Sequence, residues 1–205
     1  MNKFTRRTVI AAACAAAAMT FAPMSFAQQA PEKKDVTIAV GGKSLYYYLP
    51  LSIAEQLGYF KDEGLNVKIV DFQGGSRSLQ AVVGGSADVV SGAFEHTISM
   101  QAKKQPMTAF VLQGRAPQLA LVVSNKTMKD YKQLSDLKGK KVGVTAPGSS
   151  SQMVANFILK KGGLGPKDVA FIGVGSSSGA VSAIRSGQID ALINLDPVIT
   201  ILLKN

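Results

Sequence analysis

The sequence predicts an α/β protein with two similar lobes, each built on a parallel sheet. Apolar strands alternate with amphipathic helices along the chain, which is the pattern of parallel sheets covered by helices. Residues 67–90 and 169–193 also repeat one order: apolar strand, Gly-Ser turn, short helix, glycine stop, second apolar strand. At a constant offset of 102, the matched pairs are Ser76 with Ser178, Ala81 with Ala183, Val82 with Ile184, Gly85 with Gly187 and Asp88 with Asp190.

The first half of the chain gives a strand at residues 35–40, because Val36, Ile38 and Val40 share one face and Ala39 is apolar on the other. A helix is expected from Pro50 to Gly58, a stop residue, and its core-facing residues are Leu51, Ile53, Ala54 and Leu57. The pattern then predicts a helix over 94–103, a strand over 107–112, a crossover loop over 113–117 and a strand over 118–123.

The second half opens with a strand over 141–145, followed by a helix over 152–161 that turns Val154, Phe157 and Ile158 inward. After the repeat, Asp196 is expected to cap a helix that begins at Pro197. We therefore divide the chain into a leader (1–27), a first lobe (28–115) and a second lobe (116–205).

The leader has the form of a secretory signal peptide. Lys3, Arg6 and Arg7 precede an Ala-rich apolar run, and Ser25-Phe26-Ala27 is a small-x-small cleavage site. The alternative is a mature N-terminal helix. The paired arginines also resemble a twin-arginine signal, and Ala11-Ala12-Ala13-Cys14 resembles a lipoprotein site that lacks the usual leucine. We expect export to the periplasm by the Sec or the twin-arginine route.

The amino-acid composition excludes several kinds of functional site. Of 205 residues, 46% are hydrophobic and 18% charged, which is ordinary for a globular protein. Cleavage after Ala27 removes the one cysteine and, with it, disulfides, thiolate metal sites and cysteine nucleophiles. It leaves 20 basic and 13 acidic residues, a formal charge of +7. Because the lysines are scattered without an aromatic stripe, they predict a solvated surface that favours anionic ligands or membrane surfaces, and not a nucleic-acid interface.

Four strand-to-helix turns carry Gly, Ser or Tyr: residues 41–48, 74–77, 147–151 and 175–179. In parallel sheets such turns lie at the carboxyl edge of the strands, where open α/β folds bind ligands. Glycine lets a ligand approach the backbone, and free N–H groups at a helix start attract anions. Each turn taken singly is better explained as a tight connection with a serine cap. Two lobes with matched turns favour a binding cleft.

Three further residue types are ambiguous. His96 is the only histidine, and without metal-ligand partners it is either a ligand contact or a structural residue. Tyr46-Tyr47-Tyr48 could stack on a ring or pack in the core. Arg77 and Arg115 could pair with an acid or lie on the surface. Ser149, Ser150 and Ser151 have no neighbouring base, so serine nucleophile chemistry is not supported.

Several motifs together resemble the nitrate/sulfonate/taurine-type substrate-binding proteins of ABC importers. They cover nearly all of the chain from Val36 onward. In the first lobe they are residues 49–54, 58–65, 74–76 with Gln80-Ala81, and 84–88; in the second they are 137–144, 147–150, 187–191 and Asp196-Pro197.

The resemblance implies a type II periplasmic-binding-protein fold whose two lobes close on a small ligand, by contacts to both of them. It implies no catalytic residue, cofactor or metal, and a monomer that passes its ligand to an ABC permease with its ATPase subunit. The membrane would be reached only through the permease. Carried over by position, the ligand contacts are Gly42, Lys43, Tyr46, Gly75, Ser76, Gly92, Phe94, Glu95, Ser149, Ser150, Asn194 and Asp196.

The chain departs from this family in length. Members usually have about 300 residues or more and cross back to finish the first lobe, so we expect a C-terminally truncated chain with an incomplete second lobe and return.

Two other classes of function are compatible with this fold. The related pyrimidine-precursor synthases of thiamine biosynthesis resemble this fold, but they rely on a cysteine-rich motif and a reactive histidine and are not exported. A sensory ligand-binding domain would need a fused membrane or signalling segment. We therefore expect a binding protein and not an enzyme.

Overall fold

The computed structural model describes residues 31–204, and the residues from Glu32 onward form one compact unit. The predicted leader lies outside the described residues. The strands are β1 (Asp35–Val40), β2 (Asn66–Asp71), β3 (Val89–Ser91), β4 (Ala120–Val123), β5 (Lys141–Val144), β6 (Ala170–Gly173) and β7 (Ala191–Asn194). The helices are η1 (Tyr46–Tyr48), α2 (Leu49–Gln56), α3 (Tyr59–Asp62), α4 (Gly75–Val83), α5 (Glu95–Ala102), η2 (Leu134–Leu137), α6 (Ser150–Lys161), α7 (Ser178–Ser186) and α8 (Val198–Leu203).

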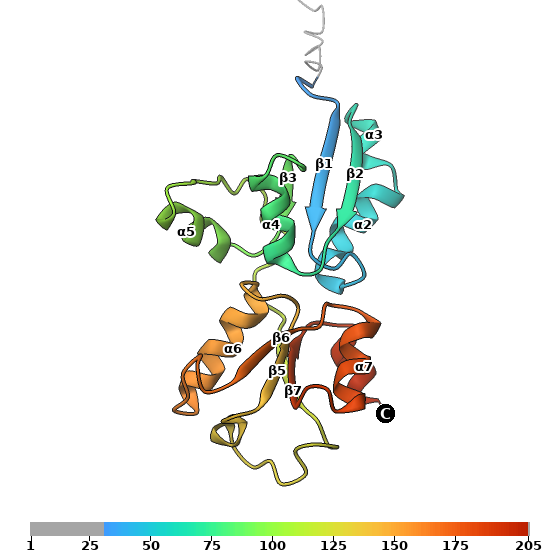
Figure 1. Ribbon diagram of the computed structural model, residues 1–205. Helices are drawn as coiled ribbons and strands as arrows, with labels where there is room; N and C mark the ends of the chain where they lie inside the picture. Colours follow the sequence, from blue (N-terminus) through green and yellow to red (C-terminus); the bar gives the residue numbers. More distant parts are fainter. Residues whose placement is uncertain (1–30, 205) are drawn as a thin grey trace, which may run out of the picture. The chain divides into compact units, whose positions relative to one another are not determined.

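The first sheet has the order β2-β1-β3, and all its strands are parallel (Figure 1). Successive residues of β1 point to opposite faces, as strand geometry requires. Ile38 and Val40 pack with residues of η1, α2 and α3, whereas Ala39 packs with Ala81 and Ala87 at α4. Helices therefore cover both faces of β1, as its run of apolar residues predicts.

The second sheet has the order β4-β7-β5-β6 and is mixed. Strands β5, β6 and β7 are parallel, but β4 pairs antiparallel with β7, with Ala120 opposite Asn194. The prediction of two purely parallel sheets is wrong at this strand. An antiparallel strand at the edge of a parallel sheet is common, because an edge strand needs one partner only. The core of this sheet is dense, and all four residues of β7 are buried.

The internal repeat is confirmed in atomic detail. The Asp88 carboxylate accepts a hydrogen bond from the Thr37 N–H at 2.8 Å, and the Asp190 carboxylate accepts one from the Lys141 N–H at 2.8 Å. In return, the Asp88 N–H donates to the Thr37 carbonyl oxygen at 2.9 Å, and the Asp190 N–H donates to the Lys141 carbonyl oxygen at 2.8 Å. In both copies, the aspartate that follows the helix is therefore hydrogen-bonded to the first half of a strand, β1 in the first copy and β5 in the second.

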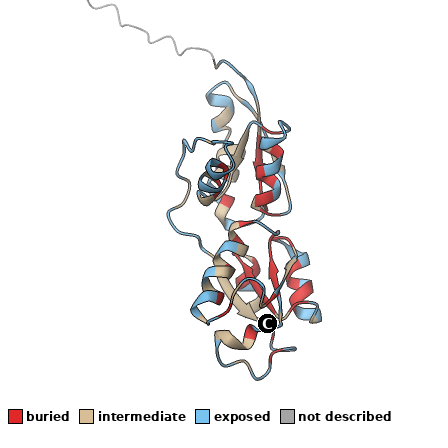
Figure 2. Cartoon of the chain, turned by 60° about the vertical axis from the view of Figure 1, so that its left-hand side comes forward, coloured by how far each residue is buried: buried red, intermediate tan, exposed pale blue. Residues whose placement is uncertain are grey.

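Residues 107–112, predicted as a strand, are not one. They make no backbone hydrogen bond within the described chain. Phe110, Val111 and Leu112 are 75, 71 and 72% exposed. In Figure 2 buried residues lie on helices as well as on strands, whereas the long connection after α5 is coloured mostly as exposed. The segment is apolar as the sequence shows, but a strand also needs a neighbour within hydrogen-bonding distance, which the sequence pattern does not reveal.

Some predicted core faces are also wrong. Ile53 and Leu57 at α2 and Phe157 in α6 are exposed, whereas Leu51 and Ala54 are half-buried. In α6 the buried apolar residues are Ala155 and Leu159. A helix whose residues are apolar over a wide arc can turn either side inward, and only its neighbours decide which.

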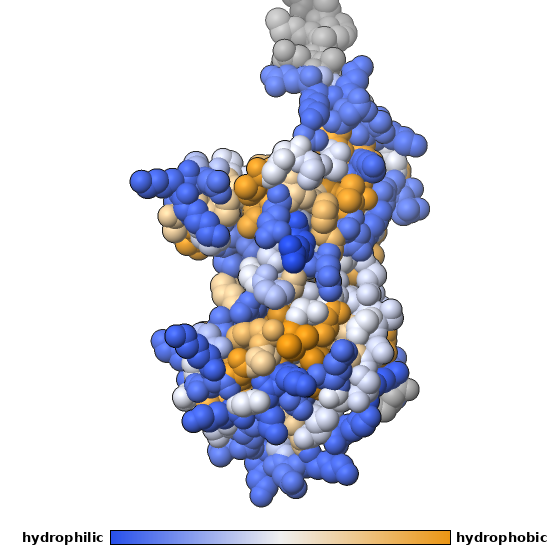
Figure 3. All heavy atoms as spheres, viewed as in Figure 1, coloured by the Kyte–Doolittle hydropathy of each residue, from blue (hydrophilic) through white to orange (hydrophobic). Residues whose placement is uncertain are grey.

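Polar residues are spread over the molecule. On the face shown in Figure 3, hydrophilic residues surround both sheets and do not gather in one patch, in agreement with the scattered lysines of the sequence. Among residues 31–204, no helix is long and apolar enough to cross a membrane.

The dense packing of the second sheet predicts a large cost for a cavity there. Ile189 is 0% exposed, whereas Ile98 on α5 is 64% exposed. We expect Ile189→Ala to lower the free energy of unfolding by about 2–5 kcal/mol. The control Ile98→Ala should change it by less than about 0.5 kcal/mol, because a surface residue leaves no cavity. Denaturant unfolding measures both; equal losses would contradict this account of the core.

Candidate ligand-binding site

The four Gly-Ser turns of the sequence meet one another. A Cβ atom added to Gly41 would lie 2.4 Å from the Gly74 carbonyl carbon and 2.4 Å from the Gly75 nitrogen. One added to Gly42 would lie 2.1 Å from Ser176 Oγ. The ends of β1 and β2 therefore touch backbone to backbone, and the end of β1 also touches the turn after β6. Glycine is required at 41 and 42 because any side chain would collide with these neighbours.

A ring of hydrogen bonds joins the turn before α4 to the turn before α6. The Ser76 N–H donates to Ser149 Oγ at 3.0 Å, Ser149 Oγ donates to Ser76 Oγ at 3.1 Å, and Ser76 Oγ donates to the Pro147 carbonyl oxygen at 2.8 Å. Ser149 is 2% exposed. These two predicted site residues thus satisfy each other, and a ligand bound between them would replace this contact.

The backbone N–H groups of the turn after β1 donate to side chains of the fold. The Asp71 carboxylate accepts hydrogen bonds from the N–H groups of Gly42 and Lys43 at 2.7 and 2.8 Å, and the Gly41 N–H donates to the Tyr48 hydroxyl at 3.1 Å. Burial raises the pKa of Tyr48 to about 12, so this hydroxyl stays neutral. The backbone donors of Gly42 and Lys43 are therefore occupied, and the Lys43 ammonium pairs with Glu55 at 2.7 Å.

The predicted ligand contacts at the end of β7, Asn194 and Asp196, form hydrogen bonds to backbone groups. Asn194 is fully buried; its amide donates to the Gly175 carbonyl oxygen at 3.0 Å and accepts from the Leu195 N–H at 2.9 Å. The Asp196 carboxylate accepts from the Thr200 N–H and hydroxyl at 2.9 and 2.8 Å, so it caps α8 as expected, although that helix begins at Val198. The Asp196 carbonyl oxygen accepts from the Tyr46 N–H at 3.0 Å, so this segment also reaches the turn after β1.

A serine-lined hollow of about 730 Å³ opens beside these turns. Its polar residues are Ser44 after β1, Ser176, Ser177, Ser178, Ser182 and Ser186 at α7, and Arg185. Ser177 and Ser178 form the start of α7, where backbone N–H groups favour an anion. Sequence reasoning identified the 175–179 turn and the 41–48 turn that contains Ser44, but it missed Arg185, since nothing in the spacing of Arg185 places it next to these turns.

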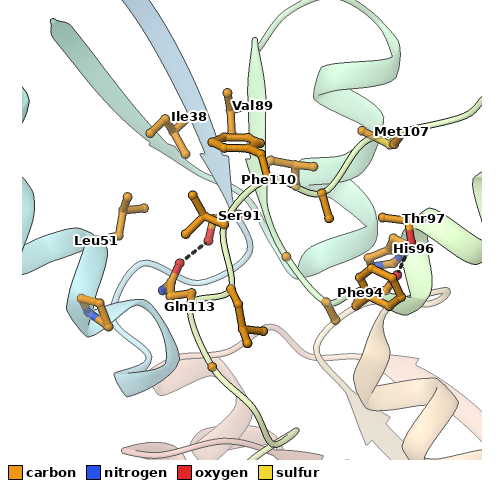
Figure 4. A pocket seen from close by; sticks show the side chains of 18 of the residues that line it. Ile38, Leu51, Val89, Ser91, Phe94, His96, Thr97, Met107, Phe110 and Gln113 are labelled. Atoms are coloured by element: carbon orange, nitrogen blue, oxygen red, sulfur yellow. Dashed lines mark hydrogen bonds between the residues drawn. The ribbon is translucent and has the colours of Figure 1, made fainter.

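A second, apolar cavity of about 530 Å³ lies along β3. Figure 4 shows Ile38, Val89 and Phe110 at one part of it and Phe94, His96 and Thr97 at another, with Ser91 hydrogen-bonded to Gln113. The predicted contacts Gly92 and Phe94 line this cavity and not the serine-lined hollow.

His96 sits against the start of α4. It is 8% exposed, its Nε2 atom makes no hydrogen bond, and a Cβ on Gly75 would lie 3.4 Å from that atom. The neighbouring Glu95 has one carboxylate oxygen, Oε1, that is also buried and without a hydrogen bond. Burial lowers the pKa of His96, partly opposed by the charge of Glu95, with Lys103 lowering it further. A neutral imidazole whose Nε2 atom makes no hydrogen bond is thus held next to one predicted site residue, Gly75.

Within residues 31–204, no group of three or more His, Cys, Asp or Glu residues is placed to hold a metal ion.

The backbone contact between the turns after β1 and β2 gives a direct test. We expect Gly41→Ala to lower the free energy of unfolding by about 1–3 kcal/mol, because its Cβ must push two backbone segments apart. The control is Gly179→Ala in α7, where the added Cβ meets its nearest atom at 3.4 Å. That change should be neutral or stabilising by up to about 1 kcal/mol. If thermal unfolding showed the two variants to be alike, the contact would not constrain the fold.

Burial of His96 gives a pH dependence. Because the pKa of His96 in the folded chain is below its usual 6.5, the unfolded chain takes up the proton first as the pH falls. The free energy of unfolding should therefore decrease below about pH 6.5 more steeply in the unaltered chain than in His96→Gln. Denaturant unfolding between pH 7.5 and about 5 measures both slopes. Parallel curves would mean that His96 titrates normally in the folded chain.

This chain matches a known family model and is similar in sequence to known proteins. The family model described as NMT1/THI5 like matches residues 46–200. A 4-amino-5-hydroxymethyl-2-methylpyrimidine phosphate synthase of Schizosaccharomyces pombe is 27% identical over 162 residues, which are 78% of this chain and 45% of that protein. The chain thus spans about half the length of the curated relatives it matches.

Two solved structures are similar. A protein of Bordetella bronchiseptica RB50 is 65% identical, with a TM-score of 0.82 over 84% of this chain and 54% of that one. The alkanesulfonate-binding protein SsuA from Xanthomonas axonopodis pv. citri, bound to MOPS, is 22% identical, with a TM-score of 0.63 over 85% of this chain and 59% of that one. The second likeness confirms the fold of periplasmic binding proteins. Because the family model matches most of the described residues, the chain belongs to the NMT1/THI5-like family.

Proposed function

We propose that the chain is a periplasmic solute-binding protein that captures a small organic or inorganic anion and delivers it to an ABC importer. The observation that carries this proposal is the convergence of four Gly-Ser turns, two of which, 41–48 and 175–179, line the serine-lined hollow. Hydroxyl groups, the N-terminal end of α7 and the Arg185 guanidinium all favour negative charge. A sulfonate, taurine or nitrate has this charge and is small enough for about 730 Å³.

The two sides of the hollow come from different sheets. Ser44 follows β1 of the first sheet, and Ser176 follows β6 of the second. A ligand that touches both would stabilise the conformation in which they are close, since it shifts the equilibrium only by its differential affinity for that state. The hydrogen bonds between Ser76 and Ser149 hold the same conformation without ligand. We propose that ligand binding and this contact act together, in a monomer that then docks on its permease.

The competing function is catalysis, because the curated relatives include a pyrimidine phosphate synthase. Catalysis of that kind would need a reactive group beyond His96, and the one cysteine of the chain, Cys14, lies in the predicted leader. We therefore propose binding without chemical change of the ligand. Incubating the chain with each ligand and recovering it unaltered would support this reading, whereas a new product would overturn it.

A thermal-shift screen tests the ligand class. We expect alkanesulfonates or taurine to raise the unfolding temperature by several degrees, and aromatic acids and pyrimidines to raise it little. A ligand that binds only the folded chain stabilises it by about 2.7 kcal/mol at 100 times its Kd. Nitrate belongs in the screen as the small inorganic anion. A shift produced by pyrimidines alone would favour the synthase-like reading.

The hollow itself is tested by a pair of serine variants. Ser176→Ala should weaken anion binding by about tenfold, because it removes a hydroxyl that lines the hollow, a loss of about 1.4 kcal/mol. The control is Ser86→Ala, whose hydroxyl donates to the Ala81 carbonyl oxygen away from the hollow. Isothermal titration calorimetry measures both. Equal affinities in the two variants would place the ligand elsewhere.

A further inference from the structure

Helix α7 forms one long wall of the serine-lined hollow. Four of its residues that line the hollow are Ser178, Val181, Ser182 and Arg185. Because they are spaced by one, three or four residues, they lie on one face of the helix. A helix rises about 1.5 Å per residue, so the Cα atoms of Ser178 and Arg185 are about 10 Å apart along its axis. This wall therefore has a different polar group at each end.

The polar groups at the start of α7 make few contacts within the fold. Ser177 is the N-cap residue, but its side chain makes no capping hydrogen bond. Ser176 is only 6% exposed, yet it lines the hollow, and its hydroxyl forms no hydrogen bond with any described residue. A buried hydroxyl without a partner costs free energy, and N–H groups at a helix start favour an anion. Both features indicate that this end of the hollow receives an acidic group.

The other end of the wall carries a cation. The Arg185 guanidinium donates a hydrogen bond to the Ile201 carbonyl oxygen at 3.3 Å. A guanidinium has five N–H donors, so others can contact a second acidic group at two points. None of the described residues that line the hollow is acidic, so no carboxylate of the lining competes for this cation.

The lining also has an apolar part. Val181 lies between Ser178 and Arg185 on α7, and Pro197, Val198 and Ile201 line the hollow from the segment of α8. Methylene groups placed against these residues would leave water without losing a hydrogen bond. A small inorganic anion at the start of α7 would leave both this apolar surface and Arg185 uncovered.

We propose that the ligand of the hollow is an elongated organic dianion. One acidic group would lie at the start of α7 and the other at Arg185, joined by an apolar chain that covers Val181 and Val198. An alkanedioate or a carboxylate with a sulfonate at its far end has this form. The inference rests on the proposed function and narrows its ligand, because an anion with one charged end contacts only half of the site.

Calorimetric titration of the chain tests this with pairs of acids of equal length. Alkanedioates from succinate to suberate are compared with the alkanoates from butyrate to octanoate. We expect adipate or suberate to bind at least tenfold more tightly than its monoacid, because the second acidic group adds a charge-assisted contact. Succinate is too short to reach both ends and should show a smaller ratio.

Two arginine variants test the second contact. Arg185→Gln should bring the affinity ratio of diacid to monoacid to about one. The control is Arg77→Gln on α4, where the arginine donates to Gln80 of the same helix at 3.2 Å and does not line the hollow. That variant should keep the full ratio, since the total charge changes equally in both.

The outcomes separate this inference from the proposed function. If monoacids bind but diacids bind no more tightly, or if the ratio survives Arg185→Gln, the dianion is wrong and the anion-binding function stands. If the ratio falls equally in Arg77→Gln, the preference reflects net charge and not the contact at Arg185. If the folded chain binds neither kind of acid and no sulfonate, the proposed function itself fails.

Discussion

The close approach of glycine backbones at the carboxyl ends of the strands is the constraint on which the site depends. Gly41 lies so near Gly74 and Gly75 that a single Cβ atom would reach 2.4 Å from their backbone. This contact fixes the ends of β1 and β2 together and lets the turn before α4 meet the turn before α6. The hydrogen-bonded ring of Ser76, Ser149 and Pro147 follows from that placement. Larger residues at these turns would separate the two sheets and remove the hollow between Ser44 and Ser176.

The polar side chains near the turns fall into two groups, those that bond to the backbone and those that line a cavity. Asp71, Asn194 and Asp196 bind backbone atoms and hold the turns in shape. The hydroxyls of Ser176, Ser177 and Ser178 line the serine-lined hollow, whereas His96, whose Nε2 atom makes no hydrogen bond, lines the separate apolar cavity. Under the proposed function, turns that already hold hydroxyls and helix N–H groups in place would bind an anion with little reorganisation.

The two sheets differ in how completely they are packed. The central strands of the second sheet have partners on both sides, and its core residues Val144, Leu192 and Ile193 are almost wholly buried. The first sheet ends at β3, where apolar residues face a cavity and the adjoining connection is exposed. We expect the second sheet to carry most of the stability and the edge at β3 to open first, because local stability follows buried apolar contacts.

The sequence by itself determined the α/β class, the order of most elements and the internal repeat, because these depend on local patterns. Asp88 and Asp190 take the same role 102 residues apart, as their register predicts. Tertiary structure decided what depends on neighbours: residues 107–112 lack a pairing partner, β4 runs antiparallel, and Phe157 faces solvent. It also decided which polar atoms are free. The sequence predicted Gly42, Lys43 and Asn194 as ligand contacts, but the structure shows that they form hydrogen bonds within the fold. Ser44 and Arg185 line one hollow only because segments that are distant in the sequence meet. Periodicity is encoded along the chain; contacts between distant segments arise only from packing.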